Sequence, residues 1–320
     1  MGLSQDTRPT LPPTAGARDA PTGVPPAAAA AAGGRSAPTD LPWPDGGSPD
    51  PPVRSLLFGL ARFEQHGRSL AATHEVLRRP WRDPPFYPRL EDNLKVLQQA
   101  LMLLEAQAAA GQHLAPAAHW LLDNTALLDE QLGSVRHGLP RSFFRLLPRL
   151  RDAPLAGLPR IYGVAWAWVA HTDSGLDPAL LQAYLGAYQQ VRELTLAELW
   201  ALPSTLRVVL IENLRRLAQR TVLAQAARDA AHHWIDSAPD PRGAAALDAT
   251  AAALERRGVA EDFLLQLRQR QDELPAPQEA MLAAWLKPRL ADAGAALLRQ
   301  QDEATEDHQS IRNAITTLRA

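Results

Sequence analysis

Apolar side chains recur at three- and four-residue spacing along this chain from about Val53 onward. One run consists of Leu56, Leu57, Leu60 and Phe63, and the next of Leu90, Leu94, Leu97, Leu101 and Leu104. This spacing places apolar side chains on one face of a helix. The pattern therefore predicts two long amphipathic helices, each with one face directed toward a core.

Local signals predict where helices begin and end. Pro116 suits a first helical turn, Asp177 with Pro178 supplies an N-cap and a favoured first residue, and "TLAE" at 195–198 is a capping box. Four prolines between Pro80 and Pro88 predict a loop or a sharp corner. Glycine stands where helices should stop, at Gly111, Gly138, Gly175 and Gly258. About nine helices and no convincing strand follow, which predicts an all-α fold, an irregular multi-helix bundle.

The stretch from Ile161 to Ala170 is an uninterrupted apolar run. A helix that crosses the bilayer core of about 30 Å needs about 20 apolar residues, and this run is half as long. Its glycine and alanines would let neighbouring helices approach closely. We therefore expect a buried central helix and no membrane span.

Composition divides the chain at about residue 52. Residues 1–52 hold 12 of the 28 prolines, seven glycines and few large apolar side chains, which predicts a disordered Pro/Ala-rich tail. Residues 53–320 form the predicted helical domain, with a main bundle at 53–258 and terminal helices at 259–320. Because the last helix runs to Ala320 without a stop signal, we expect the chain to be truncated there.

Charge and cysteine content narrow the function classes. The 33 Lys and Arg nearly balance the 35 Asp and Glu, giving a net charge of -2 that disfavours nucleic-acid binding. The absence of cysteine excludes disulfides, thiolate catalysis and zinc sites built on cysteine. The first residues, "MGLSQDTRPT", lack the basic and apolar parts of a secretory signal, so a cytoplasmic location is expected.

Two histidine-containing patterns invite a metal-site interpretation. His119 and Asp123 lie four residues apart on one helical face, but no second paired element completes a ligand set, which favours a polar helix face. His232 and His233 are adjacent and point about 100° apart on a helix, so a surface or cap role is expected. We expect no metal and no cofactor.

Catalytic motifs are equally incomplete. The sequence contains no G-x-S-x-G element and neither of the glycine-rich phosphate loops. Glu198 and Glu212 could form an acid/base pair. Capping accounts for Glu198, however, and nearby arginines account for Glu212. We expect no active site within this chain.

The stretch at 194–227 predicts the most informative helix. Its apolar face carries Leu206, Val209, Leu210, Leu214 and Leu217, and its other side carries Arg207, Glu212, Arg215, Arg216 and Arg220. The favoured interpretation is a core helix with a solvated basic face. Asn213 lies near the apolar face, where a buried amide needs partners, so we also expect a specific polar contact there.

Five motifs, in this order, resemble the N-terminal region of cyclic β-1,2-glucan synthases. They are "HWLLDN", "LPRSFFRLLPRL", "GLPRIYG" with "AHTDSGLD", "LTLAELWALPSTLRVVLIENLRRLA" and "EDHQSIRNAITTLR". The resemblance covers about residues 92–319. Members of that family are inner-membrane glucosyltransferases that build β-1,2-glucan from UDP-glucose and carry a C-terminal phosphorylase-like domain.

The resemblance implies a helical accessory or regulatory region without catalytic residues. Its implied partners are the downstream membrane and glucosyltransferase domains, and its implied location is the cytoplasmic face of the bacterial inner membrane. Structural or interfacial roles are implied at the motif positions Trp120, Asp123, Asn124, Arg160, Tyr162, His171, Asp173, Trp200, Arg207, Glu212, Asn213 and Arg215.

Two other hypotheses remain open from the residues alone. A stand-alone helical adaptor would recognise a protein partner and need nothing downstream. A stand-alone enzyme would require carboxylates from distant helices to converge in one pocket.

Overall fold

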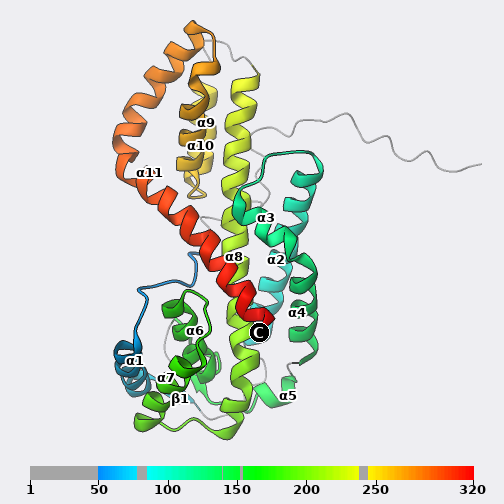
Figure 1. Ribbon diagram of the computed structural model, residues 1–320, viewed down its shortest axis with the longest axis vertical. Coiled ribbons are helices and arrows are strands. Elements are labelled where there is room, and N and C mark those ends of the chain that lie inside the picture. The colour runs from blue at the N-terminus through cyan, green and yellow to red at the C-terminus, as the bar shows by residue number, and fades with distance from the viewer. Residues whose placement is uncertain (1–49, 78–84, 139, 152–153, 238–243) are drawn as a thin grey trace, which may run out of the picture. The chain divides into compact units, whose positions relative to one another are not determined.

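The computed structural model describes residues 50–77, 85–138, 140–151, 154–237 and 244–320. Most of these residues are helical (Figure 1), so the predicted all-α fold is confirmed. The predicted tail lies outside the described residues, apart from 50–52. The helices are α1 (Leu60–Thr73), α2 (Phe86–Ala109), α3 (Pro116–Asp123), α4 (Thr125–Gly138), α5 (Arg141–Phe144), α6 (Arg160–Thr172), α7 (Pro178–Val191), α8 (Leu196–Asp236), α9 (Ala244–Glu255), α10 (Ala260–Arg270) and α11 (Ala276–Arg319), with a 3₁₀ turn at Gln271–Glu273.

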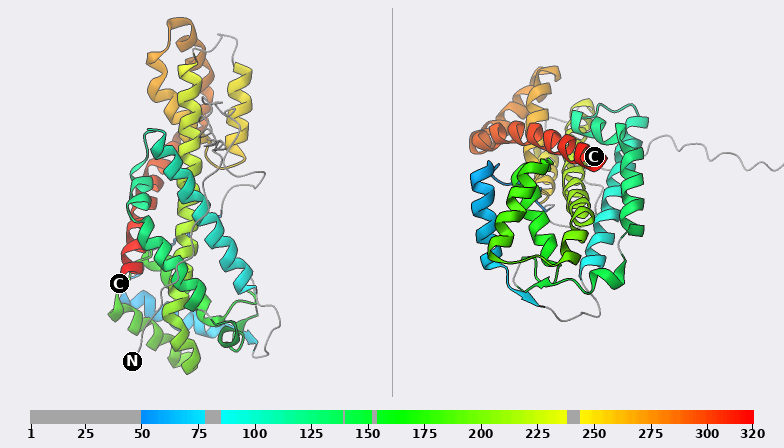
Figure 2. Two further views of the ribbon diagram at one scale, coloured as in Figure 1. Left: turned by 90° about the vertical axis from the view of Figure 1, so that its right-hand side faces the viewer. Right: turned by 60° about the horizontal axis from the view of Figure 1, so that its bottom comes forward.

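Helix α8 is the element around which the described residues are organised. It runs for 41 residues, and α2, α3, α4, α6, α10 and α11 all contact it. Figures 1 and 2 show α6 beside its first half and α10 beside its second half. Helix α2 runs along α8 from Glu212, which Arg89 contacts, to Asp229, which Gln107 contacts. Helix α1 packs separately against α7. A single helix therefore supplies one wall to most of the core.

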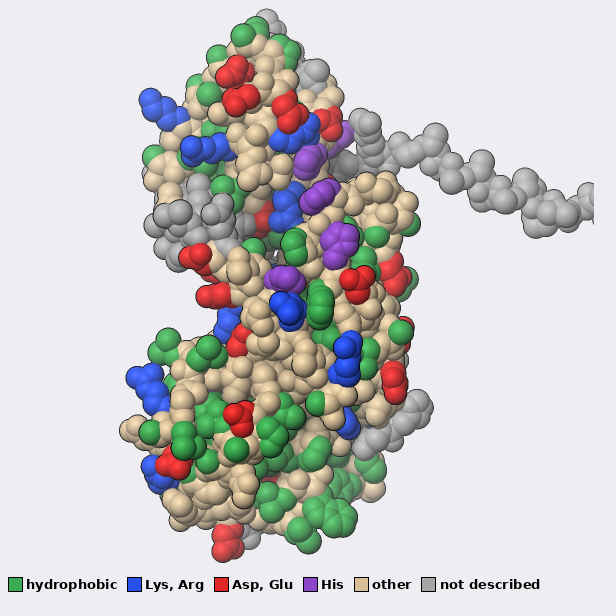
Figure 3. Space-filling view, in the orientation of Figure 1, with side chains coloured by type: hydrophobic (Ala, Val, Ile, Leu, Met, Phe, Trp, Pro, Cys, Tyr) green, Lys and Arg blue, Asp and Glu red, His purple; other side chains and the backbone are tan. Residues whose placement is uncertain are grey.

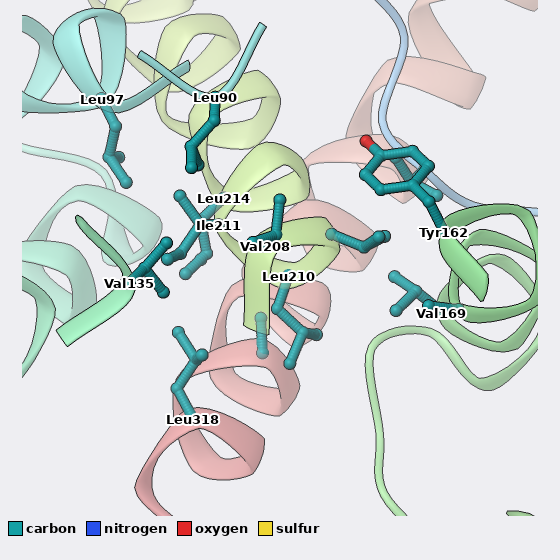
Figure 4. Close-up of a cluster of buried hydrophobic side chains, with 14 of the residues drawn as sticks. Leu90, Leu97, Val135, Tyr162, Val169, Val208, Leu210, Ile211, Leu214 and Leu318 are labelled. Atoms are coloured by element: carbon teal, nitrogen blue, oxygen red, sulfur yellow. The ribbon is translucent and has the colours of Figure 1, made fainter. Parts of the chain in front are cut away.

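The buried apolar side chains form two clusters that divide along α8. The first joins α2, α3, α4 and α6 to α8 as far as Val222 and includes the end of α11 from Ile311 onward. Figure 4 shows side chains from these helices meeting around Ile211 and Leu214. The second begins at Leu223 of α8 and joins it to α9, α10 and the first part of α11.

The predicted buried helix is confirmed as α6, whose residues from Ile161 to Ala170 are buried except for the half-buried Trp166. None of the helices searched among the described residues is long and apolar enough to cross a membrane.

The predicted helix starts are confirmed. Pro116 is the first residue of α3, and the Asp177 carboxylate accepts a hydrogen bond of 3.0 Å from the Leu180 amide at the start of α7. At the start of α8, Thr195 and Glu198 form the reciprocal capping box. These caps satisfy amides that the first helical turn leaves unpaired.

The helix ends follow the predicted glycines with one difference. Gly111 and Gly258 have φ of 72° and 69°, in the left-handed region that favours glycine. After α6, however, Asp173 and Ser174 take the left-handed conformation, with φ of 49° and 66°, rather than Gly175. Non-glycine residues in this region need compensating contacts.

The prediction of a helix that begins near Val53 is wrong. Residues 50–59, here called the strap, form neither a helix nor a strand, and α1 begins at Leu60. Leu56, Leu57 and Leu60 are exposed, and Phe63 alone of that run is buried. Other helices hold the strap, because the Ser55 amide donates to Ala170 O at 2.8 Å and the Phe58 amide to His171 O at 3.2 Å.

Two further details differ from the sequence pattern. Residues Val76–Leu77 (β1) and Arg149–Leu150 (β2) form a two-stranded antiparallel pair where no strand was expected. Pro88 lies inside the first turn of α2 rather than in a loop, a position where its missing amide proton costs no helical hydrogen bond. Residues 78–84 of the proline-rich segment lie outside the described residues.

Candidate functional site

The most densely connected polar cluster surrounds the fully buried carboxylate of Glu212, near the middle of α8. Arg89 of α2 donates to both oxygens, at 2.9 Å and 2.5 Å, and Tyr162 of α6 donates to Oε2 at 2.5 Å. Asn93 donates to Oε2 at 3.1 Å and Arg216 to Oε1 at 2.7 Å. We call these five residues the Glu212 network. It ties α2 and α6 to α8 through one side chain.

The Glu212 network continues to the strap through Arg215 and Arg216. Arg215 donates to Asn93 Oδ1 and to Asp50 Oδ2, both at 2.9 Å. Arg216 donates to the carbonyl of Pro51 at 2.7 Å. The predicted solvated basic face is therefore wrong here, because Glu212, Arg215 and Arg216 are buried beneath the strap and α2.

The electrostatics of Glu212 show a carboxylate held in its ionised form. Burial alone would raise the pKa of Glu212, but the hydrogen bonds from Arg89 and Tyr162 outweigh it and lower the pKa. Burial and the adjacent Glu212 carboxylate raise the pKa of the Tyr162 hydroxyl. A general acid or base needs a pKa near the working pH and access to substrate. Neither side chain of this pair meets that requirement.

A second polar cluster, the Asp173 junction, joins α6, α8, α11 and the strap. Asn213 accepts from the Val53 amide at 2.7 Å and donates to Ser174 Oγ at 2.9 Å. Asp173 accepts hydrogen bonds from Ser310 and Asn313 of α11. The predicted polar contact of Asn213 is thus confirmed. These hydrogen bonds also offset the strain of Asp173 and Ser174, the two left-handed residues after α6.

Arg160 and Glu198 form a third buried contact, between the first residue of α6 and the first turn of α8. Arg160 donates to both carboxylate oxygens of Glu198, at 2.7 Å and 2.5 Å, and to the carbonyl of Glu193 at 2.9 Å. Glu198 therefore serves as a cap and as an arginine partner at once. The acid/base role that the sequence left open for it is not supported by this geometry.

The end of α11 contacts the first sequence motif. Arg319 donates to Asn124 Oδ1 at 2.7 Å, and the guanidinium carbon of Arg312 lies 5.2 Å from the centre of the Trp120 ring. Motifs almost two hundred residues apart in the chain thus meet at one place. Because α11 also supplies Ser310 and Asn313, its last turns join α3 and α6.

Four of the sequence candidates lie outside these clusters. Asp123 and Arg207 are exposed, and Trp200 has 75% of its surface exposed. The ring of His171 stacks on Phe58 at a centroid distance of 3.7 Å, with Nδ1 2.7 Å from the Leu56 carbonyl, so it anchors the strap. The structure therefore brings together eight of the twelve candidates and leaves these four outside.

Sequence reasoning missed Arg89, Asn93, Ser174 and Arg216 as members of the clusters. Arg89 and Asn93 lie four residues apart beside the leucine face of α2, a spacing that places both on one side of the helix. That pair was the available signal, but nothing in the sequence indicated that it faces Glu212, more than a hundred residues away. No group of three or more histidine, aspartate or glutamate residues within the searched, described part of the chain could hold a metal ion.

Comparison with known proteins finds a relative of this chain. The chain is 33% identical over 281 residues to the cyclic β-(1,2)-glucan synthase NdvB of Rhizobium meliloti (strain 1021). The chain is thus related in sequence to part of this synthase. The aligned region covers 83% of this chain and 10% of the synthase, so the chain spans about a tenth of that relative's length. No protein-family model matches the chain.

Proposed function

We propose that this chain is a helical accessory or regulatory region of a cyclic β-1,2-glucan synthase-like glucosyltransferase and has no active site of its own. The observation that carries the proposal is the similarity to one tenth of a synthase, extending over 83% of this chain. A region of this size that acts within a larger enzyme needs a stable fold and a docking face. It does not need catalytic groups.

The buried clusters support a structural role for the motif residues. The carboxylates of Glu212 and Glu198 are buried, and both oxygens of each accept hydrogen bonds from arginine. A buried carboxylate held by arginine at both oxygens fixes helix packing and is poorly placed to bind substrate. The motifs in the Glu212 network and the Asp173 junction thus specify how α6, α8 and α11 are held together.

The beginning of α8 is the proposed docking face for the downstream membrane and glucosyltransferase domains. Trp200 and Leu196, one turn apart, have 75% and 68% of their surfaces exposed. Arg207 continues the same side of the helix and is exposed. Tryptophan and arginine are enriched at the centres of protein interfaces. The proposed location of this face is the cytoplasmic side of the inner membrane, through the parent protein.

The proposal is tested in the source organism by deleting the coding segment for residues 60–319 in frame and measuring β-1,2-glucan. We expect glucan production to fall and to recover when the segment is restored. Unchanged glucan would refute the proposal and favour the stand-alone adaptor. A purified chain that forms glucan from UDP-glucose with release of UDP, or that cleaves added glucan, would instead establish an active site here.

The docking face has its own test. Trp200→Ala should lower glucan production while leaving the unfolding temperature of the chain unchanged. Met102→Ala is the matched control, because Met102 is also an exposed apolar side chain, on α2. Equal glucan production from the two variants would contradict the proposed docking face.

A further inference from the structure

A stretch rich in arginine and apolar residues lies between α4 and α6. Residues 140–151, here called the α5 segment, include α5 and β2. The chain as a whole carries 33 Lys and Arg against 35 Asp and Glu, but the α5 segment contains no Asp or Glu. Positive charge is therefore concentrated there, in four arginines: Arg141, Arg145, Arg149 and Arg151.

The α5 segment has a buried side and an exposed side. Phe144 and Leu147 are buried, and the Phe144 ring stacks on Phe86 of α2 at a centroid distance of 5.1 Å. Leu146, between these two anchors, has 72% of its surface exposed. Its amide donates to the carbonyl of Phe143 at 3.1 Å, which fixes the backbone of the turn. The packing of its neighbours therefore holds the Leu146 side chain outside the core.

Three of the four arginines offer positive charge to solvent. Arg141 and Arg145 are exposed, whereas Arg149 is buried. The guanidinium carbon of Arg141 lies 5.0 Å from the centre of the Tyr87 ring, a contact that leaves its charge in place. Arg151 is 64% exposed and pairs with an equally exposed Glu75. Because exposed pairs of this kind are weak, another anion can compete for Arg151.

The α5 segment adjoins the beginning of α8. The Arg160 amide donates to the carbonyl of Pro148 at 2.7 Å, and the Arg160 guanidinium binds Glu198 in the first turn of α8. Leu196 and Trp200 are exposed at that end of α8. Figure 3 shows hydrophobic side chains gathered at the lower end of this face, where Figure 1 places α5 and the start of α8. The α5 segment thus continues the exposed apolar surface at the start of α8.

We propose that the α5 segment binds the surface of an anionic lipid bilayer, with Leu146 inserted below the headgroups and the exposed arginines on lipid phosphates. Arginine pairs with phosphate through two parallel hydrogen bonds, and an anionic leaflet attracts clustered basic residues. The boundary between headgroups and acyl chains accepts exposed leucine and tryptophan side chains. A bilayer surface therefore satisfies both the charge and the apolar tip. This inference goes beyond the proposed function, which places contacts with protein domains at the beginning of α8.

The test is sedimentation of the full chain with lipid vesicles. We expect binding to mixed phosphatidylcholine–phosphatidylglycerol vesicles that weakens in high salt, and weaker binding to pure phosphatidylcholine vesicles. Arg141→Gln combined with Arg145→Gln should weaken binding to the mixed vesicles by about twentyfold, or about fivefold for each arginine. Arg62→Gln combined with Arg68→Gln is the matched control, because it removes the same charge at exposed positions of α1. This control should leave binding nearly unchanged.

A second pair of variants tests the insertion of Leu146. Leu146→Ser should weaken binding to the mixed vesicles by about tenfold, because it removes the apolar side chain that enters the bilayer. Leu57→Ser is its matched control, since Leu57 of the strap is 66% exposed. If thermal unfolding shows that the double arginine variant is not folded, the comparison of Leu146→Ser with Leu57→Ser decides alone.

Three results would overturn the proposal. The first is no binding of the unmodified chain to the mixed vesicles, and the second is equal binding to the two kinds of vesicle. The third is an equal loss of binding in the α5-segment variants and their controls. Binding to immobilised polyglutamate in place of vesicles, lost in the double arginine variant, would also overturn the lipid partner and indicate an acidic protein surface.

Two outcomes separate this inference from the proposed function. A chain that is required for glucan production in cells but does not bind vesicles would refute the lipid proposal alone. A chain that binds vesicles through the α5 segment but is dispensable for glucan production would refute the proposed function alone.

Discussion

Replacing Glu212 by glutamine tests the claim that the Glu212 network holds three helices together. The substitution keeps the size of the side chain and removes its charge. Glu212 accepts five hydrogen bonds, three of them from the guanidinium groups of Arg89 and Arg216. If the glutamine amide nitrogen takes the Oε1 position, it faces two guanidinium donors and can accept from neither. If it takes the Oε2 position, it faces Arg89 Nε, Asn93 and Tyr162.

The expected cost follows from leaving buried arginine charge without its partner. Breaking a buried ion pair by removing one member costs about 3–5 kcal/mol. For a chain of this size, each kcal/mol lowers the unfolding temperature by about 2–4 °C. Glu212→Gln should therefore lower the free energy of unfolding by about 3–5 kcal/mol. Urea unfolding followed by circular dichroism measures this change.

Glu75→Gln is the matched control. Glu75 lies 3.1 Å from Arg151, and the two side chains are 60% and 64% exposed. An exposed pair of this kind contributes at most about 1 kcal/mol. If Glu212→Gln costs no more than Glu75→Gln, the Glu212 network does not stabilise the fold and the structural account of these motifs is refuted.

Three further changes have defined outcomes. Burial lowers the pKa of His74 from 6.5 to about 4, so the folded chain favours the neutral ring and its free energy of unfolding falls as the pH drops below 6.5. Unfolding in urea should show a loss of about 1 kcal/mol between about pH 7.5 and about pH 5.5. His74→Gln should remove this pH dependence. Asn213→Ala removes the acceptor of the Val53 amide, so it should lower the free energy of unfolding by about 1–3 kcal/mol and speed hydrogen exchange of that amide. Unchanged exchange would contradict the anchoring of the strap. Gly67→Ala would place a methyl group 2.7 Å from the Tyr184 carbonyl oxygen, so a thermal melt should show a loss of about 1–3 kcal/mol, and full stability would contradict the close packing of α1 on α7.

Local chemistry made much of the fold predictable. The caps at Asp177 and Thr195 and the buried run of α6 depend on neighbouring residues in the chain, and all three were predicted. The strap was not, because its leucines mimic a helical face while its amides are held by Ala170, His171 and Asn213. Periodicity carries no information about such distant partners.

The candidate site, like the fold, was predictable only where it depends on local sequence. The sequence indicated that Asn213 needs a partner, because an amide near an apolar face is costly when unsatisfied. It placed Arg215 on a solvated face, because a helix pattern cannot show that the strap covers the polar side as well. The partnership of Glu212 with Arg89 depends on the packing of α2 against α8, which no local pattern encodes.

The central claim is that the buried motif residues hold the helices together and perform no chemistry. Tyr162→Phe tests it most directly, because it removes the one hydroxyl that donates to Glu212 and leaves the ring in place. Glucan produced in cells is measured per molecule of folded protein, with abundance determined by immunoblotting. The account predicts that this ratio is unchanged, even if the amount of folded protein falls. A folded Tyr162→Phe variant that produces no glucan would contradict the account and indicate a catalytic role for this hydroxyl.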